Sequence, residues 1–459
     1  RGDDEVLRRA AVEVGTALDL GSHCADVDTL LKRTPPPTDP TRRAAFDRTL
    51  EVAARARARA EVDDVPQEAL AMLDDVLPDV EQLSHPVVNQ AIATARGHAL
   101  ARMRRYPAAA EQYELAMRES EAASDDVAAL EAAGMLAYMH ATELQDVGAA
   151  EVWLTQAQNR LLRLRPTAHQ RTTLTLREAV VLRAAGTPEL AADALHDAIE
   201  HADEGAPGQL GTLHNNLGNA YADLGEHELA AEQFRNAIEL RSRGLGADHL
   251  AVGHSHYLLA RALIERGELL EADAELREAI EIFEARDEAP LERISAIETH
   301  AISAAMRDDP ARAVEIIDEA IELAAERLPS EHRQHGSLQI NRARMLLMAD
   351  RLAEAHAAAT RGLQLEEARR GPTDSALTLP LSLLAEIELM RGNPAVTVRL
   401  TARAEAVAAS DEQRLRMTLS RLLAQAHLDC DVEAAMRAAR AALAKYQTPE
   451  PSSPALRET

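Results

Sequence analysis

Aromatic residues and cysteines are scarce in this chain of 459 residues. Aromatics make up 2% of the sequence, which is too few for a large conventional core but enough where alanine-lined helices pack closely. The two cysteines, Cys24 and Cys430, lie near opposite ends and form neither a disulfide framework nor a Cys-x-x-Cys pair. No β-branched alternating run stands between turn residues, so we expect no strands.

Long apolar runs and catalytic motifs are also missing. No segment approaches the roughly 18 apolar residues that span a bilayer, and no secretory leader is visible. The sequence contains no kinase catalytic or metal-binding loop, Walker A motif, Gly-x-Ser-x-Gly elbow or His-Glu-x-x-His motif. We therefore expect a chain that is not itself an enzyme, contacts no membrane and carries no catalytic residue or cofactor. Cytoplasmic localisation is expected, or an extracytoplasmic one if a membrane span lies upstream.

The charge balance is strongly acidic, with a net charge of −26. Nucleic-acid binding needs a basic surface, so nucleic acid is excluded as a partner. Two interpretations stay open: an acidic surface that keeps the protein soluble, or one that attracts basic partners.

Histidines cluster at two places, and each cluster raises the question of a metal site. His249, His254 and His256 are close in sequence, and His332 and His335 stand one helical turn apart. A His pair at this spacing can bind a metal, but no further ligand has suitable spacing. We expect no metal site and a structural or solvated role for these residues.

The most informative segment is residues 211–242, where six residues fall at fixed offsets from Gly211. They stand at positions 7, 8, 11, 20, 24 and 27 and are Leu217, Gly218, Tyr221, Ala230, Phe234 and Ala237. Small residues at positions 8, 20 and 27 let two helices approach, and Tyr221 and Phe234 are expected to fill the space between them. This spacing is that of the tetratricopeptide repeat (TPR), a helix–turn–helix unit of about 34 residues.

Similar helix pairs precede and follow this segment, about ten in all. Because each pair exposes an apolar face that only a neighbouring pair can bury, they should stack into one array. The expected fold is all-α, an α-solenoid in the form of a right-handed TPR superhelix. Five parts are predicted. They are an N-terminal juncture with a Pro-rich spacer (1–42), TPR-like pairs (43–203), longer repeats (204–370), degenerate pairs (371–446) and a disordered tail (447–459).

The repeats after residue 204 lengthen to about 42 residues. Gly218, Ala260, Ala301 and Ala343 occupy the same repeat position at that interval. The segment Leu245-Gly246-Ala247-Asp248-His249 resembles the linker of kinesin-light-chain-type TPRs, and 328–332 looks like a second, degraded copy. The resemblance implies a protein-binding repeat array.

The N-terminal part carries a second resemblance. A short helix, Cys24-Ala25-Asp26, a Leu-rich helix and Thr34-Pro35-Pro36-Pro37 occur in the order found before the TPR region of myxobacterial-type serine/threonine protein kinases. The sequence begins with Arg1 rather than Met, so it looks like a fragment. The resemblance implies the C-terminal sensory or scaffolding part of such a kinase, in bacterial signal transduction, and carries over no catalytic residue.

In TPR proteins the first helix of each pair lines a concave groove, so we expect a protein or peptide partner to bind there. Asn and Arg recur at groove positions; an amide can pair with a peptide backbone, and Arg with a carboxylate. The candidates for this peptide-binding groove are Asn215, Asn216, Asn219, Tyr257, Arg261, Asn341 and Arg344. The alternative is a solvated polar groove without a specific ligand. The sequence leaves the partner and the oligomeric state open.

Overall fold

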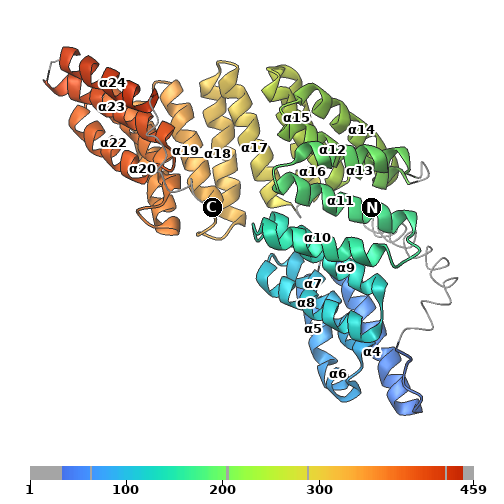
Figure 1. Cartoon of the computed structure of the whole chain (residues 1–459). Coiled ribbons are helices and arrows are strands. Elements are labelled where there is room, and N and C mark those ends of the chain that lie inside the picture. The colour runs from blue at the N-terminus through green and yellow to red at the C-terminus, as the bar shows by residue number, and fades with distance from the viewer. Residues whose placement is uncertain (1–33, 62–64, 203–205, 287–288, 430–431, 448–459) are drawn as a thin grey trace, which may run out of the picture. The chain divides into compact units, whose positions relative to one another are not determined.

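The structure, a computed structural model, describes the chain except for residues 1–33, 62–64, 203–205, 287–288, 430–431 and 448–459 (Figure 1). The described residues form 21 α-helices and one short 3-10 helix, with no strand among them. The all-α prediction is therefore confirmed. The helices expected before residue 34, both cysteines and the tail after Gln447 lie outside the described residues.

The chain divides into two compact units, Arg1–Leu258 and Leu259–Thr459. The finer division predicted from the sequence stays a prediction. The helices of the first unit are α4 (Pro40–Glu61), α5 (Pro66–Asp75), α6 (Leu77–Leu83), α7 (Pro86–Arg102), α8 (Tyr106–Ala123), α9 (Asp126–Thr142), α10 (Val147–Leu161), α11 (Ala168–Ala184), α12 (Pro188–Glu200), α13 (Pro207–Asp223) and α14 (His227–Leu245).

Helix α15 (Leu250–Glu265) contains the division between the units. The helices of the second unit are α16 (Leu269–Arg286), α17 (Pro290–Met306), α18 (Pro310–Arg327), α19 (Arg333–Met348), α20 (Leu352–Arg370), the 3-10 helix η1 (Ser375–Leu377), α21 (Thr378–Met390), α22 (Pro394–Val407), α23 (Asp411–Asp429) and α24 (Val432–Gln447).

Successive helices pair in sequence order, and the described part of the chain holds the ten pairs that the sequence predicts. We name the first helix of each pair an A helix and the second a B helix. The A helices are α4, α7, α9, α11, α13, α15, α17, α19, α21 and α23. One division was not predicted: the B element of the first pair is split into α5 and α6 at Val76, with Pro78 in the first turn of α6.

The two helices of a pair pack through small residues, as the repeat spacing predicts. Gly218 and Gly97 each face an aromatic ring of their own pair: a Cβ on Gly218 would lie 2.7 Å from Phe234, and one on Gly97 would lie 2.9 Å from Tyr113. Phe234 and Tyr113 are fully buried. Tyr221 differs from the expectation, because it is only partly buried and its hydroxyl lies 2.6 Å from His196 Nε2 of α12.

Every A–B turn from the second pair to the ninth contains one residue in the left-handed region. Four of these residues are glycines with φ of 77° or 78°: Gly186, Gly225, Gly267 and Gly392. The other four have φ between 54° and 64°: Arg104, Gln145, Asp308 and Asp350. The turn geometry is therefore common to the repeats, whereas glycine is used in only half of them.

Residues 34–39 of the Pro-rich segment are non-helical and are packed against other helices, and α4 begins at Pro40. Thr34 N donates to Ala123 O at 3.0 Å, and His85 Nε2 lies 3.1 Å from Pro35 O. The segment therefore contacts the second helix pair. None of the helices that the structure describes combines the length and apolar character of a membrane span.

Candidate peptide-binding surface

Asn215, one of the predicted groove residues, lies inside the protein. Its side chain is 4% exposed, and its Oδ1 accepts hydrogen bonds from Arg241 Nη1 at 2.9 Å and Ser255 Oγ at 3.0 Å. Arg241 also donates to Ala251 O, so it joins α13, α14 and α15. Burial lowers the pKa of Arg241 to about 10. Asn215 thus stabilises the stacking of two pairs and does not line a groove that a ligand could reach, contrary to the prediction.

The other candidates keep more exposure. Asn216 is half-buried and donates to Thr212 O at 3.0 Å, while Asn219 and Tyr257 are also half-buried; these three lie in the first unit. Arg261 and Arg344 in the second unit are exposed. Asn341, also in the second unit, donates to Glu298 Oε1 at 2.6 Å.

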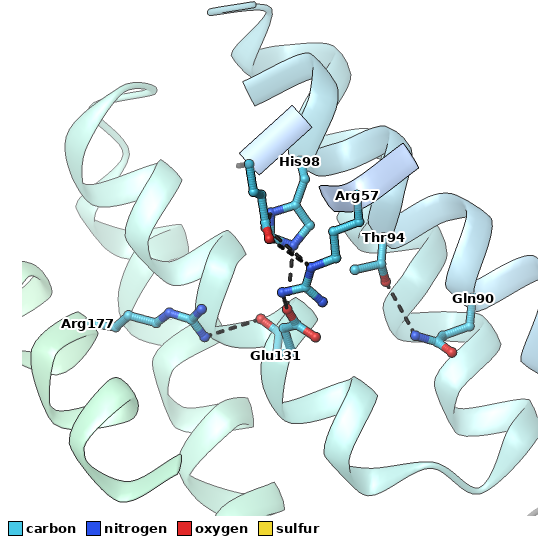
Figure 2. Close-up of polar contacts among 7 residues, drawn as sticks. Arg57, Gln90, Thr94, His98, Glu131 and Arg177 are labelled. Atoms are coloured by element: carbon cyan, nitrogen blue, oxygen red, sulfur yellow. Dashed lines mark hydrogen bonds and ion pairs between the residues drawn. The ribbon is translucent and has the colours of Figure 1, made fainter. Parts of the chain in front are cut away.

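A larger polar cluster lies on four consecutive A helices of the first unit, α4, α7, α9 and α11 (Figure 2). We call it the charged cluster; it consists of Arg57, Glu61, His98, Glu131 and Arg177. Arg57 forms ion pairs with Glu61 at 3.1 Å and with Glu131 at 2.6 Å. His98 Nδ1 lies 2.6 Å from Glu61 Oε1, and its Nε2 lies 3.4 Å from Glu131 Oε1.

These side chains are crowded by protein but not sealed from solvent, since Arg57 keeps 39% and Glu131 29% of its side-chain exposure. Burial alone would raise the pKa of Glu131, but Arg57 and His98 outweigh it and hold that pKa well below its ordinary value. In the same way, burial opposes the charged form of His98, yet hydrogen bonds to Glu131 and Glu61 raise its pKa. The cluster therefore favours ionised carboxylates and a protonated histidine.

Arg177 differs from the other members because it has no carboxylate partner among the described residues. Its hydrogen bond runs from Nη1 to the backbone oxygen of Glu131 at 3.4 Å, a long contact for a guanidinium with five N–H groups. Burial lowers the pKa of Arg177, and Glu131 only partly offsets this. Gly134 makes room for it, because a Cβ there would lie within 3.0 Å of Arg177 Cδ.

Comparisons with known proteins agree with this architecture. Residues 209–285 match the tetratricopeptide repeat family, and no curated protein matches the chain. The apo form of RapI is 15% identical, with a TM-score of 0.55 over 69% of this chain and 86% of RapI. A Rap protein complexed with Competence and Sporulation Factor is 14% identical, with a TM-score of 0.51 over 82% of this chain and 99% of that one. The fold is a TPR-type α-solenoid.

A putative kinesin light chain with nearly identical TPR-like repeats, from Podosopora anserina, is 19% identical. The similarity covers 45% of this chain and 99% of that one, with a TM-score of 0.40. None of these comparisons adds support to the kinase resemblance of the N-terminal part.

The TPR A helices of the second unit carry a carboxylate centre of their own. Glu298 on α17 accepts hydrogen bonds from Gln334 at 2.5 Å, Ser337 at 3.2 Å and Asn341 at 2.6 Å, all on α19. Burial raises the pKa of Glu298, although these donors lower it in part. One N–H of the Asn341 amide is therefore engaged between two A helices, and the half-buried amide keeps its second N–H and its Oδ1 for another partner.

The linker histidines of the TPR array cap helices. Nδ1 of His249 accepts from Ala251 N at 3.1 Å, and Nδ1 of His332 accepts from Gln334 N at 3.2 Å. His85 does the same at the start of α7, with Val87 N at 3.3 Å. Each cap satisfies one N–H at the start of an A helix. No metal-type cluster of His, Cys, Asp or Glu occurs among the residues that the structure describes.

Proposed function

We propose that this chain is a non-catalytic scaffold that binds a protein or peptide segment on its A-helix surface. The observation that carries the proposal is the charged cluster of the first unit. Four A helices direct ionised side chains toward one another, and these side chains stay partly exposed (Figure 2). Bringing charges together at a partly buried site costs free energy, and these side chains differ from the buried Arg241 network because they remain accessible to a ligand.

The proposed ligand feature is a carboxylate, from an acidic side chain or a chain terminus. The two carboxylates of the cluster, Glu61 and Glu131, already form ion pairs with Arg57 and His98. Arg177 has no ion pair among the described residues. A guanidinium with unused donors binds a carboxylate through two parallel hydrogen bonds. Of the candidates from the sequence, Asn216, Asn219 and Tyr257 in the first unit remain proposed contacts of this ligand. Arg261 and Arg344 belong to the second unit and remain proposed contacts there, separately from the charged cluster.

The TPR fold is compatible with this role. The Rap protein of the same fold was solved in complex with Competence and Sporulation Factor. At 14% identity this similarity supports the fold alone. The proposal therefore depends on the chain's own charged cluster.

Binding to an array of immobilised short peptides tests the proposal. Wild type is expected to select peptides with acidic residues, and Arg177→Gln to bind them about ten- to a hundredfold more weakly, since it loses a charged hydrogen bond. Arg171→Gln, on the same helix α11 but outside the cluster, is the matched control and should bind as wild type does. Equal binding by Arg177→Gln and wild type would exclude the charged cluster as the site.

A second proposal is that the chain is the regulatory region of a bacterial serine/threonine protein kinase. It rests on the order of elements in the N-terminal segment, most of which lies outside the described residues. Sequencing the gene upstream of Arg1 tests it. A Gly-rich loop and a kinase catalytic loop are expected there, and an unrelated upstream sequence would refute the proposal.

A further inference from the structure

A cavity of about 420 Å³ opens in the second unit between α18, α19 and α20. Its lining residues recur at helical spacing, so each helix contributes one face. The lining consists of Ile321, Ala325, Leu328, Ser330, His335, Leu338, Gln339, Arg361 and Leu365. The volume lies in the range of roughly 300–1,000 Å³ that small-molecule sites occupy.

Five of the nine residues that line this cavity are apolar. Of these, Leu338 on α19 is fully buried, while Ile321, Leu328 and Leu365 are only partly buried. Part of their apolar surface therefore remains uncovered in the cavity, and a ligand with an apolar body would bury it.

Two polar side chains of the lining have no partner within the described part of the protein. Arg361 on α20 is exposed and has no ion pair or hydrogen bond there, and the Gln339 amide on α19 has no hydrogen bond there. By contrast, His335 Nε2 lies 3.0 Å from Pro329 O, and Ser330 Oγ donates to Glu331 Oε1 at 2.9 Å. One cation and one amide thus remain available to a ligand.

We propose that this cavity is a binding site for a small organic acid with an apolar body. The apolar part lies against Ile321, Leu328 and Leu365, and the carboxylate binds Arg361, with Gln339 as an additional donor. Local charge selects the acid: the exposed Arg361 guanidinium, which has no ion pair among the described residues, favours an anion over a cation at this cavity. The site lies apart from the charged cluster, which belongs to the first unit, so the proposal does not depend on peptide binding.

Titration calorimetry of the full chain with three matched probes tests the proposal: 4-phenylbutyrate, 4-phenylbutanamide and 4-phenylbutylamine. The acid is expected to bind at least about tenfold more tightly than the amide, and the amine more weakly than both. Equal affinities for the three probes, or no binding of the acid at millimolar concentration, would overturn the proposal.

Variants assign the binding to this cavity. Arg361→Gln should reduce the affinity for the acid to that for the amide, and Ala325→Phe, which fills the cavity from an exposed position, should abolish both. Arg333→Gln removes an exposed charge from α19 outside the lining and should leave both affinities unchanged. Unchanged acid binding in both Arg361→Gln and Ala325→Phe would refute the site.

Competition separates this proposal from peptide binding. The acid should not displace an array-selected acidic peptide, and Arg177→Gln should bind the acid as wild type does. If the acid does not bind and Ala325→Phe instead abolishes capture of a protein partner, the cavity is a protein-docking surface and the small-acid proposal is wrong.

Discussion

At the scale of single residues, one-atom differences decide how closely the helices of a pair approach. Gly218 is in contact with the Phe234 ring, and a Cβ there would lie 2.7 Å from the ring edge. Since Phe234 is 1% exposed, the ring has no free space to move into. The fixed position of glycine in the repeat is thus explained by packing within the pair.

Gly218→Ala is therefore expected to destabilise the first unit by about 1–3 kcal/mol through overpacking. Urea unfolding followed by circular dichroism measures the loss. The double variant Gly218→Ala/Phe234→Leu should recover part of it, because the smaller side chain leaves room for the methyl group. Additive losses would show that the ring is not the cause.

His98 gives the first unit a pH dependence. Its pKa is raised in the folded protein above the ordinary 6.5, so its contribution to stability is complete below that pH. The contribution is lost as pH rises through the folded pKa. The pKa values of Glu61 and Glu131 are lowered, so their contribution is present above about 4.5 and is lost as pH falls.

Unfolding free energies between about pH 5 and 8 test this assignment. Wild type should lose stability relative to His98→Gln as the pH rises above 6.5. His201, whose pKa is also raised, is present in both proteins, so the difference isolates His98. A difference that does not change with pH would contradict the assignment.

At the scale of the helix pair, the left-handed residue of the A–B turn is a common requirement. Gly225 adopts φ 78° and a Cβ there would meet nothing within 4 Å, so only backbone strain opposes a side chain. Gln145 adopts φ 54° at the equivalent turn of α9 and α10 and is exposed.

Opposite substitutions at these two turns should have opposite effects. Gly225→Ala is expected to cost about 1 kcal/mol, and Gln145→Gly to gain a few tenths to about 1 kcal/mol, because glycine relieves the strain. Thermal and urea unfolding measure both. A loss of stability in Gln145→Gly would show that its side chain makes a contact worth more than the strain.

The pairs could be predicted from the sequence, whereas the polar networks across pairs could not. Small residues recur at fixed offsets because every pair needs the same close contact, and this spacing identifies the ten pairs. Arg57, His98, Glu131 and Arg177 come from four different helix pairs, and stacking brings them together. Asn215 and Asn216 were both predicted to line the groove, but only Asn216 is partly exposed. Neighbouring helix residues differ by about 100° in direction, so these two side chains cannot face the same surface.

At the scale of the whole molecule, stacking of the helix pairs buries apolar side chains and brings polar side chains of adjacent pairs within hydrogen-bond distance. The pairs exclude water through Ala and Leu, while Arg241, the charged cluster and Glu298 connect adjacent pairs by hydrogen bonds within each unit. The division between the units falls within α15, where the repeat spacing is uninterrupted. Repeat spacing alone therefore does not predict it.

We propose that the A helices of the first unit form the partner-binding surface. Hydrogen–deuterium exchange with and without an array-selected acidic peptide tests it most directly. We expect slower exchange in α7, α9 and α11, with little change in α8, α10 and α12, and much weaker protection in Arg177→Gln at the same peptide concentration. Protection of the B helices instead, or equal protection in Arg177→Gln and wild type, would contradict it.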